Sequence, residues 1–326
     1  MVSVSSLSLG VLAFVAASAG LGDAVAQEPA RLETSPRGQI LVLDANLQEA
    51  FIASDVADPT DMWNFARRAA ALLPYAPDVV LLQEVVEPSA INVATFLGEE
   101  VGHSYEVAIA PGPTAFPKAD EAPDEQVQQE TAILINSGTV QMMGERGFFE
   151  TSYSPSDGIE GQKAKTKLHA YAAVREIQSK RTYPLMSLHF VPNQYFNSEE
   201  VGWAYKERWS RSVAEFLDAT FPPPKSGGHI VGGDFNNRRC RDVIEARGCE
   251  RFPFWDVMTA ENDYSDAIFT AGGAEEIGTA KRIDYIFGRL DPTSAASDLA
   301  YDDEEKSDPA TFYSDHRLIW TLLADR

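Results

Sequence analysis

The stretch HIVGGDFNNRRC, residues 229–240, places an apolar run, two glycines, an acid and two amides side by side. An apolar run that ends in polar residues is typical of a strand buried on both faces. Asp and Asn after a strand usually form a turn, so the stretch alone permits either a corner of the chain or a binding function for Asp234 and Asn236. The glycines would let the backbone approach a neighbour closely where the strand ends.

The same pattern recurs along the chain. Further runs are QILVLDAN (39–46), DVVLLQE (78–84), TAILIN (131–136), YPLMSLHF (183–190), RIDYIFG (282–288) and HRLIWTLL (316–323). Helical periodicity lies between some of them, at 59–74 with Thr60 or Asp61 as the cap, at about 89–101, and at 198–224. We expect exposed loops at 111–129 and 291–309. Strands and helices mixed over one core predict a single α/β domain with a large sheet system.

Acidic residues dominate the charge. There are 49 Asp and Glu against 27 Lys and Arg, which gives a formal net charge of −22 and an isoelectric point near 4.5. This balance argues against a broad basic surface for nucleic acid or anionic lipid. A metal ion, or a few clustered Arg and Lys, could still attract a phosphate locally.

The first 26 residues read as a secretory signal. The run at 7–22 is uncharged and apolar, and AVA at 24–26 supplies a small-residue cleavage pattern, although Lys and Arg are missing near Met1. A membrane anchor is the alternative, but the run is short and rich in Ser and Gly. We predict a signal at 1–26, an N-terminal extension at 27–38 and one domain at 39–326. Cleavage removes Asp23 and changes the net charge from −22 to −21. We expect a secreted monomer without stable membrane association.

Two cysteines, Cys240 and Cys249, lie close together in the sequence. In a secreted chain they suggest one disulfide that closes a small loop, and two buried thiols are the alternative. The absence of a Cys/His cluster argues against a structural zinc site.

Polar side chains at strand ends indicate a shared site. Carboxylate and amide oxygens that meet at one sheet edge suit Mg²⁺, Mn²⁺ or Ca²⁺. Two histidines at similar positions, His189 and His316, suit proton transfer, whereas the other three are expected to be structural. The polar side chains in question are Asn46, Glu84, Asp234, Asn236, Asp284 and Asp315.

Four motifs in order, LLQE, GGDFNN, KRIDYIF and SDH, resemble the endonuclease/exonuclease/phosphatase superfamily, the deoxyribonuclease I-like fold. The resemblance covers about residues 39–323. It implies a four-layer αββα sandwich in which two packed mixed β-sheets are flanked by helices. It also implies hydrolysis of phosphate esters with a divalent cation, usually Mg²⁺.

The resemblance also implies a role for each matching residue. Asn46, Glu84 and Asp315 match the metal side of the site. Asp234 and Asn236 match the pair that orients the attacking water and contacts the phosphate. Two His–carboxylate pairs follow, His316 with Asp284 and His189 with Glu130, of which the second matches deoxyribonuclease-like members rather than the apurinic-site repair branch.

Several positions depart from the family pattern. The basic residue that often follows the QE motif, and reaches a DNA groove, is replaced by Val85, Val86 and Glu87. Gln48 stands where the family usually has an Arg two residues past the asparagine. Substrate-binding cations could instead be Lys167 (or Lys165), Arg238 and Arg239, with a solvated loop as the alternative for the two arginines.

The resemblance implies a secreted Mg²⁺-dependent phosphodiesterase, a deoxyribonuclease-like endonuclease acting on nucleic acid. The net charge of −21 and the missing groove-reaching base favour an alternative, a phospholipid or sphingomyelin phosphodiesterase or a small-molecule phosphatase. A second alternative is a non-catalytic binding module on the same fold. Against it, each position that performs chemistry carries a competent residue.

Overall fold

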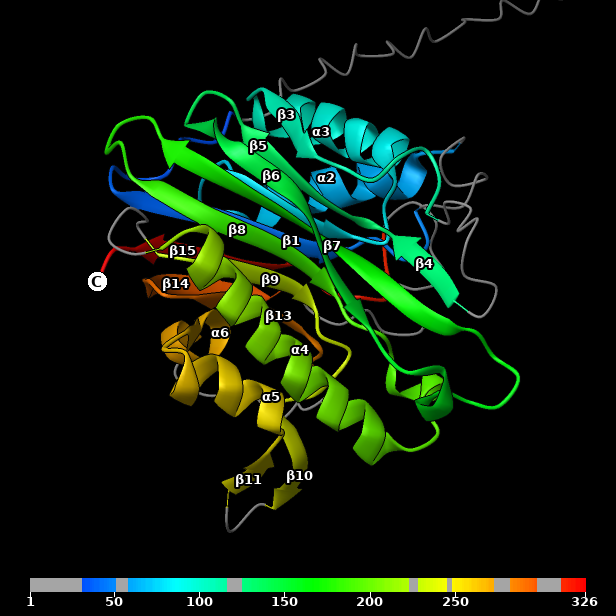
Figure 1. Cartoon of the computed structure of the whole chain (residues 1–326). Helices are drawn as coiled ribbons and strands as arrows, with labels where there is room; N and C mark the ends of the chain where they lie inside the picture. The colour runs from blue at the N-terminus through cyan, green and yellow to red at the C-terminus, as the bar shows by residue number, and fades with distance from the viewer. Residues whose placement is uncertain are drawn as a thin grey trace, which may run out of the picture.

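The computed structural model describes residues 31–50, 58–115, 125–222, 228–244, 248–272, 282–297 and 312–326. Two large β-sheets pack face to face, and helices cover their outer sides (Figure 1). The predicted signal, with residues 27–30 of the predicted extension, lies outside the described residues. Within the described ranges, none of the helices combines the length and apolar character that a membrane crossing needs.

Both sheets are mixed. In the first, β1 runs parallel to β2 and the other neighbours are antiparallel. Its strands, in spatial order, are β14 (Asp291–Ser297), β15 (Ile319–Ala324), β1 (Gln39–Asn46), β2 (Val79–Gln83), β5 (Thr131–Asn136) and β3 (Tyr105–Ile109). In the second, β8 runs parallel to β9, and β6 (Val140–Ser152) joins by pairing with β7. Its remaining strands are, in order, β12 (Ser265–Asp266), β13 (Asp284–Gly288), β9 (Ile230–Asp234), β8 (Thr182–His189), β7 (Ala164–Glu176) and β4 (Glu125–Gln129).

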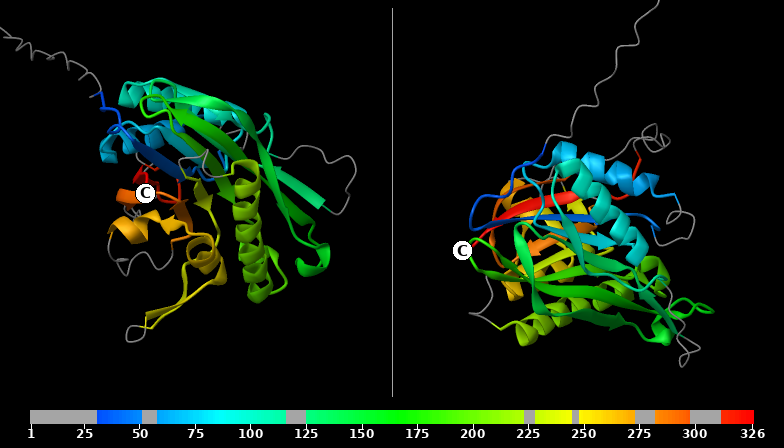
Figure 2. Two further views of the ribbon diagram at one scale, coloured as in Figure 1. Left: turned by 60° about the vertical axis from the view of Figure 1, so that its left-hand side comes forward. Right: turned by 90° about the horizontal axis from the view of Figure 1, so that it is seen from above.

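The helices flank this pair of sheets. α2 (Thr60–Leu72) and α3 (Glu87–Val101) lie on one side and α4 (Glu199–Thr220) on the other, as Figure 2 shows. The described residues also form shorter helices, which are α5 (Pro253–Asp256), the π-helix η3 (Val257–Glu261), α6 (Ala267–Gly272) and the 3₁₀ turns η1 (Pro155–Asp157) and η2 (Asn193–Tyr195). A separate hairpin of β10 (Cys240–Ile244) and β11 (Gly248–Arg251) projects from the body.

Strand residues buried on both faces explain why four layers form. Along β1, Leu41 and Leu43 pack with α2 and α3, while Ile40 and Val42 point between the sheets. A third core joins the second sheet to α4, and Val231 of β9 belongs to it. Each sheet therefore has an apolar layer on each face. The predicted fold class, a four-layer αββα sandwich, is confirmed.

The glycines of the HIVGGDFNNRRC stretch permit two close contacts. A Cβ at Gly232 would lie 2.6 Å from the Leu81 side chain of the facing sheet. Gly233 has φ +139°, and a Cβ there would lie 2.1 Å from the carbonyl oxygen of Leu188 on β8. A side chain at Gly233 would push β9 away from β8, whereas one at Gly232 would displace the Leu81 side chain.

Three local predictions were wrong. Pro59, rather than Thr60 or Asp61, is the N-cap of α2, because the Thr60 hydroxyl donates to Asp58 instead (2.7 Å). Part of the predicted loop at 111–129 forms β4, which pairs with β7. Part of the loop predicted at 291–309 forms β14, because small Ser and Ala residues pair there with β15. The side chains of Cys240 and Cys249 lie outside the described residues, so their disulfide stays a prediction.

Candidate active site

Strand ends from both sheets bring the predicted residues together. In the second sheet, Asp234 is the last residue of β9 and pairs with His189 on one side and Asp284 on the other. In the first sheet, Asn46 ends β1, and Glu84 directly follows β2 with a left-handed φ of +59°. The sheets meet at this edge, where Asn46 Nδ2 donates to Glu84 Oε1 (3.0 Å) and to Asp234 Oδ2 (3.3 Å).

His189 forms the first predicted His–carboxylate pair. Its Nδ1 lies 2.8 Å from Glu130 Oε1, and its Nε2 lies 3.6 Å from Asp234 Oδ2. Lys167 forms a salt bridge with the same Glu130 and lies 3.4 Å from His189 Nδ1. Burial, together with the charge of Lys167, lowers the pKa of His189 to about 4. The imidazole is therefore neutral near pH 7.

Lys167 does not occupy the position predicted for it. We expected a substrate-binding cation, but its side chain is buried within the second sheet and paired with Glu130. Burial lowers the pKa of this amine to about 7. The Lys167 side chain is closed off from solvent and contacts Glu130 and His189, so it acts on the His189 pair instead.

His316 forms the second pair. Its Nδ1 lies 3.0 Å from Asp284 Oδ2, and its Nε2 lies 3.8 Å from both Asp234 Oδ2 and Asp315 Oδ1. Burial alone would lower the pKa of His316, but Asp284 and the other acids outweigh it and raise this pKa well above its usual value. The two imidazoles thus approach the same Asp234 oxygen in opposite protonation states.

Asn236 sits on a tight turn, as the sequence predicted, with a left-handed φ of +49°. Its backbone N–H donates to Asp234 Oδ1 (2.6 Å), and its Nδ2 donates to Asp234 Oδ2 (3.0 Å) and to the Phe190 carbonyl (2.9 Å). Lys206 of α4 donates to the Asn236 carbonyl (2.6 Å) and to Asn193 Oδ1. These bonds fix the amide of Asn236 beside Asp234.

Sequence reasoning missed Lys206. It is fully buried, and desolvation lowers its pKa to about 7. One signal was present, because Lys206 stands three residues before Trp209 and seven before Val213, on the buried stripe of α4. A lysine on an apolar stripe needs acceptors, and here they come from Asn236 and Asn193.

Asp44 was also missed. It is completely buried between the sheets, where Gln83 Nε2 donates to its Oδ1 (2.9 Å). Burial, together with the charge of Asp284, raises the pKa of Asp44 well above its usual value. In the sequence, Asp44 is one acid among the apolar residues of β1, and this position does not show whether its side chain is buried. The second sheet packs over it and buries it.

The donor set fits a divalent cation. The site sets five carboxyl groups against the protonated His316 and the Lys167 amine, whose pKa is lowered to about 7. The carboxyl groups are those of Glu84, Glu130, Asp234, Asp284 and Asp315. Such an excess of hard oxygen donors favours Mg²⁺-type ions. Asp234, Asp284 and His316 each offer a ligand atom, and these three atoms lie within 4.8 Å of one another.

Of the three residues predicted to hold the metal, two present a carboxylate to the site and one presents an amide N–H. Burial would raise the pKa of Glu84, but His189 and Asn46 lower it, so this carboxylate is ionised near pH 7. Asp315 is more than half exposed beside His316. Asn46, however, turns its Nδ2 toward the acids, while its Oδ1 accepts from the Gln48 N–H (3.0 Å). As placed, Asn46 is a hydrogen-bond donor, and its role as a metal ligand stays a prediction.

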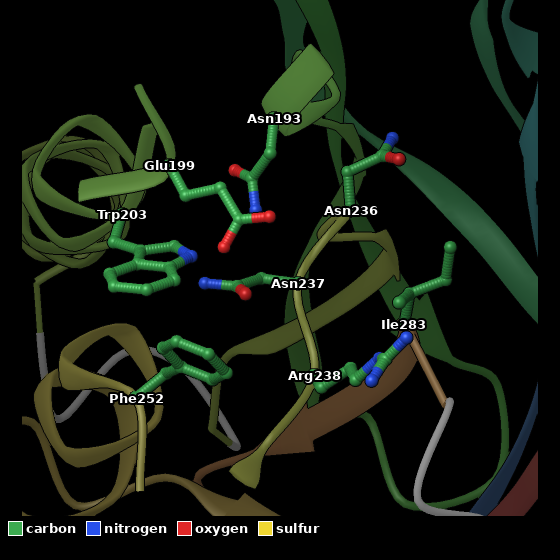
Figure 3. A pocket seen from close by; sticks show the side chains of 8 residues that line it. All are labelled: Asn193, Glu199, Trp203, Asn236, Asn237, Arg238, Phe252 and Ile283. Carbon is green, nitrogen blue, oxygen red and sulfur yellow. The ribbon is translucent and has the colours of Figure 1, made fainter. Parts of the chain in front are cut away.

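The two arginines that were predicted to bind substrate have different surroundings. Arg238 is exposed and lines a cavity of about 360 Å³ next to Asn236 (Figure 3). The Arg239 guanidinium instead packs on aromatic rings, 4.4 Å from the centroid of Phe269 and 5.8 Å from that of Trp255. Arg239 is thus committed to cation–π packing, which differs from the predicted contact with substrate.

The remaining histidines have structural partners, as expected. His103 Nε2 contacts the Leu32 carbonyl (2.8 Å), and His229 Nε2 contacts the Phe221 carbonyl (3.1 Å). His169 Nε2 contacts the Thr151 hydroxyl (2.7 Å), and its Nδ1 accepts from the His189 backbone N–H (3.2 Å). None of these bonds involves a carboxylate of the candidate site.

Residues 46–316 match the sequence profile of the Endonuclease/Exonuclease/phosphatase family. The chain therefore belongs to this family of phosphoesterases. No curated protein sequence matches the chain.

Solved structures share the fold at low sequence identity. The catalytic domain of human Nocturnin with bound sulfate is 15% identical, with a TM-score of 0.56 over 90% of this chain and 96% of that one. A mannosyl-6-phosphatase of Bacteroides thetaiotaomicron is also 15% identical, with a TM-score of 0.56 over 87% and 99%. TDP2 of D. rerio, complexed with a single-strand DNA product, is 17% identical, with a TM-score of 0.50 over 87% and 98%.

Proposed function

We propose that this phosphoesterase is a divalent-metal-dependent phosphodiesterase that cuts nucleic acid as a deoxyribonuclease-like endonuclease. The observation that carries the proposal is the convergence of two His–carboxylate pairs on one oxygen. His189 Nε2 and His316 Nε2 lie 3.6 Å and 3.8 Å from Asp234 Oδ2. Glu130 and Asp284 hold the opposite ring nitrogens, so in each ring Nε2 is the atom free to exchange a proton with a reactant.

Hydrolysis of a diester needs two proton transfers. Water attacks phosphorus and loses a proton, while the P–O bond to the leaving oxygen breaks and that oxygen gains one. Two imidazoles in opposite protonation states can serve both steps, one Nε2 accepting the proton of water and the other supplying the proton to the leaving group. Asn236 would donate its amide to a phosphoryl oxygen. Its Nδ2 now donates to Asp234 Oδ2 and to the Phe190 carbonyl, so the phosphoryl oxygen would replace one of these two acceptors.

A cation supports the same chemistry. Glu84 and Asp315 would hold it, with Asn46 as the predicted third ligand, and it would neutralise charge that builds on the phosphoryl oxygens. Mg²⁺ is the proposed ion, and Mn²⁺ or Ca²⁺ suit the same oxygen donors. The excess of carboxylates over cationic groups described above supports this part of the proposal.

A second candidate keeps the chemistry and changes the substrate. Lys167 is buried and Arg239 is packed on aromatic rings, which leaves Arg238 as the exposed member of the three predicted substrate cations. Fewer phosphate contacts favour a small phosphate ester or a lipid headgroup over a long polyanion. A non-catalytic binding module is the third possibility.

One assay separates these functions. Plasmid DNA, sphingomyelin and bis-p-nitrophenyl phosphate are incubated with the protein in Mg²⁺ or in EDTA, at low and high salt. We expect DNA cleavage that needs Mg²⁺ and falls steeply with salt. Activity on sphingomyelin with none on DNA would overturn the nuclease assignment. No turnover of these diesters, nor of the monoester p-nitrophenyl phosphate, would favour the binding module.

Variants test the mechanism. His316→Ala should lose at least about 100-fold in kcat, the usual contribution of a general acid or base. His103→Ala, remote from the acids, is the matched control and should keep full activity. Full activity of His316→Ala on every substrate would refute the mechanism.

We also propose that the protein is secreted as a monomer after cleavage behind Ala26. The apolar run at 7–22 and the AVA pattern support the cleavage. Intact mass of the exported protein, with and without reductant, tests both the cleavage site and the Cys240–Cys249 disulfide. Light scattering tests the monomer, and retention of residues 1–26 would contradict the assignment.

A further inference from the structure

A cavity that Asn236 helps to line opens beside the candidate active site. Its volume is about 360 Å³, within the range of small-molecule sites. Two aromatic side chains, Trp203 of α4 and Phe252, form one wall with ring centroids 5.0 Å apart. Figure 3 shows these rings facing polar side chains from the Asn236 turn and from the start of α4. The full lining is Asn193, Glu199, Trp203, Asn236, Asn237, Arg238, Phe252 and Ile283.

One polar group in this lining lacks a partner. Asn237 is 4% exposed, and its Nδ2 makes no hydrogen bond within the described part of the chain. The side chain points toward Trp203, with Glu199 on one side and Phe252 on the other (Figure 3). A buried amide donor left unpaired costs free energy, so its position is explained best by an acceptor on a ligand.

The neighbouring groups define what that ligand carries. Glu199 offers a carboxylate that accepts hydrogen bonds, opposite the amide of Asn237, which donates them. The aromatic wall suits a flat ring. A flat heterocycle whose edge carries both a donor and an acceptor, joined to a phosphate held at Asn236, satisfies all three features, and a nucleobase has this chemistry.

We infer that the cavity of Trp203, Phe252, Glu199 and Asn237 binds a nucleobase of the substrate next to the scissile phosphate. The inference rests on the proposed function and specifies its substrate class as a nucleotide ester. Stacking on an aromatic ring provides affinity for any base, and the edge contacts to Asn237 and Glu199 orient it. Because Asn236 and Asn237 are adjacent, a base in the cavity places its own phosphate at the catalytic turn.

The test compares small diesters that share one leaving group. The substrates are the 3′ and 5′ isomers of thymidine p-nitrophenyl phosphate, phenyl p-nitrophenyl phosphate and methyl p-nitrophenyl phosphate. We expect at least one thymidine isomer to exceed the methyl ester by about 10-fold or more in kcat/KM. Trp203→Ala should remove this advantage and leave the methyl ester within about 2-fold, while Trp203→Phe should retain most of it.

Further variants separate the edge contacts from stacking. Asn237→Leu should lower kcat/KM for the preferred thymidine isomer by about 5-fold or more, and leave the phenyl ester nearly unchanged, because the phenyl ring that would replace the base has no acceptor on its edge. Trp63→Ala, at an exposed tryptophan of α2, is the control and should alter none of these values. Thermal unfolding of each variant verifies that it folds.

The outcomes distinguish the two proposals. Suppose that all the diesters are cut, and that Trp203→Ala either lowers every rate by the same factor or lowers no rate at all. The base site is then wrong, and the proposed function stands. An equal rate for the methyl and thymidine esters would also overturn the base site and leave the proposed function standing. If the wild type with Mg²⁺ cuts plasmid DNA but none of these diesters, the base site is wrong and the proposed function stands. If it cuts neither, the proposed function fails, and the base site fails with it.

Discussion

Replacing Gly233 by Ala tests how the second sheet delivers Asp234. The new Cβ would lie 2.1 Å from the Leu188 carbonyl oxygen and 2.7 Å from the Leu188 nitrogen. Both neighbours are main-chain atoms of a central strand, so no flexible side chain can move aside. To restore an ordinary contact, β8 and β9 must separate by roughly 1 Å in a close-packed interior.

The energetic cost has two parts. A φ of +139° is strained for a residue with a side chain, at about 1–3 kcal/mol. Overpacking between the strands adds about 1–3 kcal/mol. We therefore expect a loss of about 2–6 kcal/mol in the free energy of unfolding, a large share of the roughly 5–15 kcal/mol that holds a domain together.

Activity should fall as well, because His189 and Asp234 end the two strands that must separate. A displacement of about 1 Å in a catalytic group can cost about 100-fold in rate. Urea unfolding followed by fluorescence, with kcat/KM for a diester, measures both effects. Gly144→Ala is the control, since a Cβ there meets nothing within 4 Å. If Gly233→Ala matched this control in stability and activity, the proposed role of the glycine would be refuted.

Three further predictions concern buried charge and the metal. The free energy of unfolding of Asp44→Asn should match that of the wild type below about pH 4. Above that pH Asp44 ionises in the unfolded chain but stays protonated in the folded one, so the wild type loses about 1.4 kcal/mol of stability for each unit by which the folded pKa is raised. Urea titrations at pH 4, 6 and 8 measure this loss, and an equal pH dependence of the two proteins would contradict it. For Lys206 the sign is opposite, because its folded pKa is lowered to about 7 and the unfolded chain holds the extra proton. The stability of the wild type relative to Lys206→Met should therefore rise between pH 7 and pH 10, and a flat difference would refute this. Glu84→Gln should raise the Mg²⁺ concentration for half-maximal activity about 10-fold or more, and an unchanged value would remove Glu84 from the metal side.

Much of the architecture and the site followed from the sequence alone. Apolar runs buried on both faces, each ending in a polar residue, predicted the sheets and the edge where Asn46, Glu84 and Asp234 meet. The pairing of His316 with Asp284 and of His189 with Glu130 came from ordered motifs, and the distances agree with it. These features could be predicted because strand burial and strand ends are local properties of the chain.

Other features depended on the packing of one element against another. Lys167 and Arg239 looked like cations available to substrate, but the first is buried beside Glu130 and the second packs on aromatic rings. Asp44 and Lys206 became notable only when the second sheet and the Asn236 turn enclosed them. Burial of a charge, and the shift in pKa that follows, is set by neighbours distant in sequence. The sequence by itself therefore determined which residues meet at the site, and only the tertiary structure decided which charges remain exposed to a substrate.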